Sequence, residues 1–185
     1  MKKSVKIFAG LLSLMFIFSA CSSPKASRIK QEFNPLFTER IFRQAALNFV
    51  SNLLQDKKMN ELILLTRKQS GNPHAVPILF IEENLEENSK SFRPQLESFY
   101  ETFQHGVNAA GKFIVKRRKE IPAGTSFVPD FIFRGSVHPF YKQDGRTEVW
   151  QLFFSFQIVE SVNHKILWTH KKEFRMLKKQ GLFGD

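Results

Sequence analysis

The side chains that most often carry out catalysis or bind metals are few and scattered in this sequence. None of the five histidines lies in a short motif typical of hydrolases or zinc proteases (His74, His105, His138, His164 and His170). His164 and His170 would be ~20 Å apart in an extended strand, too far for one metal ion. The carboxylates of "EENLEEN", Glu82 to Asn88, fall in a predicted turn, where acidic side chains are usually only solvated. The sequence therefore predicts a protein that is not an enzyme and needs no metal or cofactor.

One reactive group remains, the thiol of the single cysteine, Cys21. It follows a segment typical of an export signal, with three early lysines, an apolar run from Ile7 to Phe18, and the small residues Ser19 and Ala20. The apolar run would cover only ~18 Å as a helix, less than the ~30 Å core of a bilayer. "FSAC" resembles the lipobox of bacterial lipoproteins, although leucine is usual where Phe18 stands. The alternative is an ordinary secretory signal followed by a chance cysteine.

The resemblance to a lipobox implies a subcellular location for the protein. Residues 1–20 would be the signal peptide, and Cys21 would carry fatty acids, which anchor a protein firmly when two or more chains are attached. Ser22 stands where an aspartate would signal retention in the inner membrane, so we expect an outer-membrane anchor facing the periplasm. Residues 21–37 read as anchor and flexible tether, whose last sixteen residues could reach at most ~55 Å.

Net charge narrows the class of partner. Without the three lysines of the signal, 25 Lys and Arg stand against 17 Asp and Glu, a net charge of +8. A basic protein often binds nucleic acid, but export makes that partner improbable and we expect none. Anionic lipids, glycans and acidic protein surfaces remain, beside the simpler interpretation of a solvated basic surface.

Hydrophobic periodicity predicts one α/β domain at residues 38–175, followed by a basic tail at 176–185. Thr38 is the expected start of a first helix, whose apolar residues from Phe42 to Leu54 recur every three or four positions. We further expect helices at 59–67 and 92–110, the latter stopped by Gly111, and strands at 75–83, 112–118, 130–141, 148–160 and 165–174. The expected fold is a small mixed sheet of about four to five strands with helices mainly on one face.

The strand at 148–160 shows the clearest alternation in the sequence. Trp150, Leu152, Phe154, Phe156 and Ile158 would all point to one face of the sheet. The opposite face of the same strand would be mixed, with Gln151, Phe153, Ser155 and Gln157 among its members. One face of the strand is therefore expected to be apolar and the other, which also holds Val149 and Val159, to be mixed.

Five segments in this order resemble the LpoB family, lipoprotein activators of penicillin-binding proteins. They are "AALNFVSNLLQDKKMN", "PILFIEENLEENSKSF", "VNAAGKFIVKRR", "PDFIFRGSV" and "FSFQIVESVNHKILWTHKKEF", which together run from about Ala45 to Phe174. The resemblance implies the small α/β sandwich that this family shares with the amino-terminal domain of TolB. Two features depart from the family: Arg118 to Pro129 leaves little room for its usual helix, and the tether is short.

Two surface features are candidate partner-binding sites. The first is "RGSVHPFY", in which Arg134, Phe140 and Tyr141 have the composition of a binding hot spot, although Phe140 could equally be core. The second is the basic run "KRRK", with Lys116, Arg117 and Arg118, which could join Lys171, Lys172, Arg175, Lys178 and Lys179 in one basic face. Plain solvation of these charges is the alternative.

Two functions are consistent with the sequence. In the first, an outer-membrane lipoprotein binds a bifunctional penicillin-binding protein and activates peptidoglycan synthesis. In the second, the domain is a structural unit of an envelope secretion or motility complex, which the short tether favours because the domain would stay near the outer membrane. In both, the protein acts by contact with another envelope protein.

Overall fold

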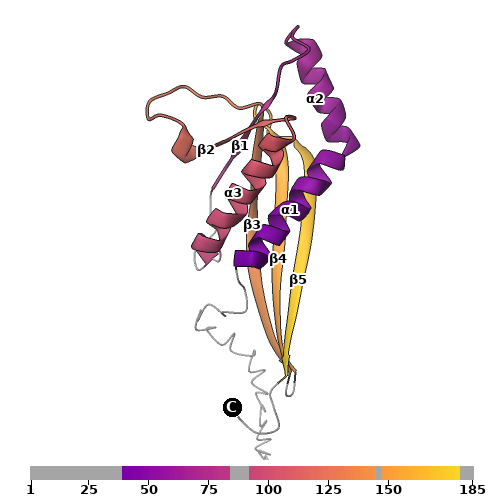
Figure 1. Ribbon diagram of the computed structural model, residues 1–185, viewed down its shortest axis with the longest axis vertical. Helices are drawn as coiled ribbons and strands as arrows, with labels where there is room; N and C mark the ends of the chain where they lie inside the picture. The colour runs from indigo at the N-terminus through magenta and orange to yellow at the C-terminus, as the bar shows by residue number, and fades with distance from the viewer. Residues whose placement is uncertain (1–38, 84–91, 145–146, 180–185) are drawn as a thin grey trace, which may run out of the picture. The chain divides into compact units, whose positions relative to one another are not determined.

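A computed structural model gives the fold of the chain and describes residues 39–83, 92–144 and 147–179. The expected order of elements is confirmed (Figure 1). The predicted signal peptide, Cys21, the predicted tether and Thr38 lie outside the described residues. The elements are α1 (Glu39–Gln55), α2 (Lys57–Gln69), β1 (Ile78–Ile81), α3 (Arg93–Ala109), β2 (Ile114–Arg117), the 3-10 turn η2 (Arg118–Glu120), β3 (Phe131–Asp144), β4 (Thr147–Glu160) and β5 (Ile166–Lys179).

The five strands form one mixed sheet in the order β2-β1-β3-β4-β5. β1 lies parallel to both of its neighbours, β2 and β3, while β3, β4 and β5 form a long antiparallel meander. α3 connects β1 to β2, as parallel neighbours require a crossover. The predicted class, a mixed sheet with helices mainly on one face, is therefore confirmed.

The helices bury the face of the sheet that the alternation of β4 predicts. Leu152, Phe154, Phe156 and Ile158 are all buried, whereas Trp150 is half-buried. α1 and α3 lie side by side over this face (Figure 1), and their apolar stripes point into it. Gly111, with φ of +65°, follows the end of α3 and confirms the predicted stop.

Phenylalanine rings connect the two layers. Phe103 stacks on Phe133 with centroids 4.2 Å apart, and Phe99 stacks on Phe156 at 4.8 Å. Phe49 of α1 meets Phe156 edge-on at 5.3 Å. Such pairs contribute ~0.5–1.5 kcal/mol each beyond the burial of their area. The many phenylalanines of the sequence therefore serve the core.

Gly135 permits this packing at the centre of the sheet. It pairs with Phe156 across β3 and β4, and the Phe156 ring lies over it. A Cβ atom at position 135 would lie 2.2 Å from the backbone oxygen of Ser155 and 2.5 Å from the Phe156 ring. Real Cβ contacts are never so short, so only glycine fits here.

Several boundaries differ from the expectation, most of all at β1, at the end of β3, which continues to Asp144, and at β5. β1 begins at Ile78, because Pro77 has no N–H for the ladder and the first backbone donor, that of Ile78, binds the Asp130 carboxylate at 2.7 Å. β5 continues to Lys179, so the stretch from 176 expected as a tail belongs to the sheet as far as 179. It continues because Met176 and Leu177 still alternate and pair with Trp150 and Val149 of β4. Within Arg118 to Pro129 the only helical residues are those of η2.

Candidate partner-binding face

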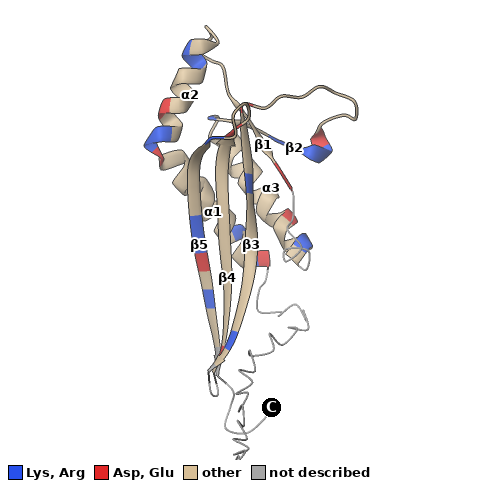
Figure 2. Cartoon of the chain, turned by 180° about the vertical axis from the view of Figure 1, so that it is seen from behind, with Lys and Arg blue, Asp and Glu red and all other residues tan. Residues whose placement is uncertain are grey.

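The meander leaves one of its faces without helices. Figure 2 shows this side of β3, β4 and β5 in front, with α1 and α3 behind it. We call it the open face, and it is formed by alternate residues that the strand register places in rows. These are Arg134, Ser136, His138 and Phe140 of β3, Gln151, Phe153, Ser155 and Gln157 of β4, and Thr169, Lys171, Glu173 and Arg175 of β5.

A polar hollow of about 350 Å³ lies on the open face at the level of Arg134. Its lining includes Arg134, Glu82, Ser155, Gln157 and Thr169. Arg134 is half-buried, yet it forms no ion pair with any residue that the structure describes. Its guanidinium can therefore bind a carboxylate or carbonyl group of a partner without first breaking an ion pair to a described residue.

A second hollow, of about 490 Å³, adjoins the first around Phe153. The Phe153 side chain is 39% exposed, an unusual position for a large ring in the middle of a central strand. Lys171 and Glu173 line the same hollow from β5, and Glu173 accepts a hydrogen bond from Gln151 at 2.9 Å. An exposed ring beside polar and charged side chains is typical of protein-binding surfaces.

Ser136 and His138 form a hydroxyl–imidazole pair on this face, with Oγ and Nε2 2.7 Å apart. A hydroxyl and a base at this distance are the first requirement for nucleophilic catalysis. An acyl-transfer site also needs backbone N–H groups directed at the reacting oxygen, but here Ser136 and Ser155 pair within the β3–β4 ladder. We therefore interpret the pair as part of a binding surface.

The structure divides the first candidate site. Arg134 and Phe140 are both on the open face, and Phe140 is 48% exposed. They are six positions apart, however, which is ~20 Å along the strand. Tyr141 points to the opposite face, where its ring lies 4.4 Å from that of Trp150. These three residues do not form one cluster, because neighbours along a strand point to opposite sides.

The basic run also separates. Lys116 is half-buried, Arg117 is fully buried, and Arg118 is exposed at the start of η2. β2 and β5 are the two opposite edges of the sheet. The prediction that this run and the basic residues of β5 form one basic face is therefore wrong.

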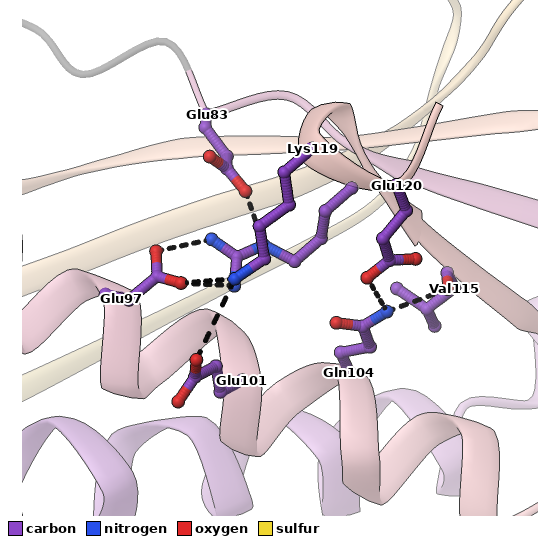
Figure 3. Close-up of polar contacts among 8 residues, drawn as sticks. Glu83, Glu97, Glu101, Gln104, Val115, Lys119 and Glu120 are labelled. Atoms are coloured by element: carbon purple, nitrogen blue, oxygen red, sulfur yellow. Dashed lines mark hydrogen bonds and ion pairs between the residues drawn. The ribbon is translucent and has the colours of Figure 1, made fainter. Parts of the chain in front are cut away.

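Arg117 is held inside by carboxylates. Its Nη1 donates to Glu97 Oε1 at 2.8 Å, its Nη2 donates to Glu97 Oε2 at 2.5 Å, and its Nε donates to Glu83 Oε1 (Figure 3). The guanidinium also lies 5.6 Å from the centre of the Tyr100 ring. This two-pronged pairing joins the ends of β1 and β2 to α3, so we assign Arg117 a structural role.

The same network shifts several pKa values. Hydrogen bonds from Arg117, and then from Lys119 at 2.7 Å, hold the pKa of Glu97 at about 2. Burial opposes the charge on Arg117, but the bonds to Glu97 and Glu83 raise its pKa above the usual value. Burial also raises the pKa of the Tyr100 phenol. All three groups therefore keep one protonation state throughout the neutral range.

The open face contains residues that sequence reasoning did not single out as a site. Phe153, Ser155 and Gln157 were expected only as the mixed face of their strand. The signal was an aromatic residue in that polar alternation, together with the prediction that helices lie mainly on one face. Among the described residues, no group of three or more histidine or acidic side chains could hold a metal, and none of the helices is long and apolar enough to cross a bilayer.

The chain matches no protein-family model, and no curated protein matches its sequence. Among solved structures it is similar to lipoprotein GNA1162 from Neisseria meningitidis, at 13% identity and a TM-score of 0.37 over 56% of this chain and 84% of that one. It is also similar to the PelC dodecamer from Paraburkholderia phytofirmans, at 13% identity and a TM-score of 0.34 over 56% of this chain and 73% of that one. A third similar structure is the LpoB C-terminal domain from Salmonella enterica, at 12% identity and a TM-score of 0.30 over 60% of this chain and 93% of that one. Likeness of this degree carries no argument about function.

Proposed function

We propose that this chain is a lipoprotein of the bacterial envelope that works by binding a protein partner through its open face. The observation that carries the proposal is the open face itself, where Arg134 has no ion-pair partner among the described residues and Phe153 is exposed on a central strand. Cys21, within its lipobox-like sequence, would attach fatty acids and hold the domain at the outer membrane, facing the periplasm.

The partner we propose is a bifunctional penicillin-binding protein, whose peptidoglycan synthesis the chain would activate. Support comes from the five segments that resemble the LpoB family and from their order along the chain. In this proposal the protein has no catalytic residue of its own, and a contact with the synthase would favour its active conformation.

A rate measurement tests the proposal directly. The purified protein, added to the bifunctional synthase of the same bacterium, should raise the rate of glycan polymerisation or crosslinking. Arg134→Ala and Phe153→Ala should remove most of this effect. Arg118→Ala and Leu47→Ala are matched controls, because both side chains are exposed away from the open face. An unchanged synthase rate, with no binding at micromolar protein, would exclude activation.

The lipid anchor has a separate test. Cells grown with a labelled fatty acid should incorporate the label into the wild-type protein and not into Cys21→Ser. A wild-type protein without label would refute the anchor and leave binding through the open face as a separate question.

The short tether favours a second candidate, a structural unit of an envelope assembly. From Cys21 to Glu39 the chain is too short to cover more than ~65 Å even when fully extended. A domain restricted in this way would meet partners near the outer membrane. A stable ring or large oligomer in size-exclusion chromatography would support assembly, and a monomer would support the activator.

A further inference from the structure

The far end of the meander carries a row of large side chains across all three strands. Tyr141 of β3 pairs with Trp150 of β4, and Trp150 pairs with Met176 of β5. We call these three residues the tip row. All of them are half-buried, and the indole N–H of Trp150 donates to Glu148 Oε2 at 3.4 Å. Tryptophan and tyrosine held in this way present an apolar ring with a polar edge.

The tip row lies beyond the helices that cover the same face. Phe42, in the first turn of α1, packs against Phe154 with ring centroids 5.2 Å apart. Trp150 is four residues further along β4, or ~13 Å beyond that contact. Figure 1 shows the same arrangement, with the ends of β3, β4 and β5 extending past the starts of α1 and α3.

Positive charge accompanies these side chains. In the sequence, the strand residues 141–144, 147–150 and 174–179 include four basic residues, Lys142, Arg175, Lys178 and Lys179, against two acidic ones, Asp144 and Glu148. Leu177, on the opposite face of the same strand end, is 59% exposed. Aromatic, aliphatic and basic side chains together are typical of surfaces that bind the interface of an anionic bilayer.

The first described residues of the chain lie at this end of the domain. α1 begins, at Glu39, at the end of the helix layer that is nearer the tip row (Figure 1). Cys21, the proposed lipid-bearing residue, is only eighteen positions earlier in the sequence. A bilayer anchored through Cys21 would be within reach of the tip row, because the intervening chain can span up to ~65 Å.

We propose that the tip row and its basic neighbours contact the surface of a bilayer that contains anionic lipids, and so orient the domain. The inference rests on the proposed lipid anchor and adds a second, weaker contact to it. Each basic side chain near an anionic surface strengthens binding about fivefold, so this contact is reversible and sensitive to salt. Lys142 and Arg175 lie on the open-face side of the strand ends. The rest of the open face, around Arg134 and Phe153, would stay accessible, because the strands would stand away from the membrane.

Tryptophan fluorescence tests this contact, because the chain has only two tryptophans and Trp168 is 6% exposed in the core. The lipid-bearing protein with Trp168→Phe, isolated in detergent, would be reconstituted into vesicles of phosphatidylcholine with or without phosphatidylglycerol. Trp150 emission should shift to the blue, and brominated lipids should quench it, only with phosphatidylglycerol and only at low salt. Lys142→Gln with Arg175→Gln should weaken the contact ~25-fold.

A matched reporter on the open face controls for general proximity to the bilayer. Phe153→Trp, in a chain with Trp150→Phe and Trp168→Phe, should not be quenched in the same vesicles. If Trp150 is not quenched although the protein floats with the vesicles, the tip contact is refuted and the anchor stands. A protein that does not float with the vesicles refutes the anchor and this inference together.

Discussion

The two faces of the β3–β4–β5 meander use the same strands for different purposes. On the covered face, Gly135 and Phe156 pair so closely that no other residue fits at position 135. On the open face, one residue further along, Ser136 pairs with Ser155 beside hollows that remain unfilled. The difference suggests that one face sets the stability of the fold and the other its interactions. Substitutions on the two faces should therefore have separable effects.

Gly135→Ala should cause the largest loss of stability. The new methyl group would overlap a backbone oxygen and the Phe156 ring, neither of which can move without disturbing the sheet. We expect the free energy of unfolding to fall by about 3 kcal/mol or more, measured by urea denaturation. Ser136→Ala is the matched control and should change it by less than ~0.5 kcal/mol. Equal effects of the two variants would contradict the division between faces.

Two arginines extend the comparison. Arg117 is buried with two carboxylates, whereas Arg134 has no ion-pair partner among the described residues. Arg117→Met should lower the free energy of unfolding by ~2 kcal/mol, below the usual range for a broken buried pair because Glu83 and Glu97 are partly exposed. Arg134→Met should leave it within ~0.5 kcal/mol of the wild type. A larger loss in Arg134→Met would show that the open face is structural.

The open face should in turn dominate binding. Arg134→Ala and Phe153→Ala should each weaken the partner complex by ~1–2 kcal/mol, or roughly tenfold in Kd, as measured by calorimetry with the proposed synthase. Both variants should unfold at wild-type urea concentrations. Gly106→Ala, next to Val50 on the covered side, should leave Kd unchanged while it alters stability. An effect of that variant on Kd would show that the two faces are coupled.

The smallest effect concerns pH. The pKa of Glu97 is lowered from 4.5 to about 2 by Arg117, so the folded state favours its ionised form. This contribution is complete above pH 4.5 and is lost as the pH falls towards 2. Because the Glu97 side chain is 44% exposed, we expect less than ~1 kcal/mol. The urea midpoint should fall less between pH 5 and pH 2.5 in Glu97→Gln than in wild type. Parallel curves would exclude the ion pair as the cause.

Most of the fold, but only part of the candidate site, can be predicted from the sequence. The alternation of β4 predicts which side chains are buried, because period two is a direct consequence of strand geometry. The same alternation through Phe113, Val115 and Arg117 points Arg117 inward, but its charge led to the expectation of a surface residue. Glu83 and Glu97, which make its burial possible, are 34 and 20 positions away in the sequence.

The order of strands in the sheet, like the partners of Arg117, cannot be predicted from local sequence patterns. The basic residues of β2 and β5 could be joined into one face only if these strands were neighbours, and the sequence does not specify that they are opposite edges. Arg134, Phe140 and Tyr141 are close in sequence but divided by strand geometry. A helix-covered side could be predicted for β4, whereas the hollows around Phe153 depend on three strands and their register.

The position of β1 has a consequence for the rate of folding. β3, β4 and β5 follow one another in the sequence, so they can assemble as hairpins on a microsecond timescale. β1 enters between β2 and β3, and the bond from Ile78 to Asp130 closes a separation of 52 residues. Closing long loops makes parallel strand pairing slow. The insertion of this four-residue strand is therefore the step that we expect to limit how fast the unfolded chain reaches its native state.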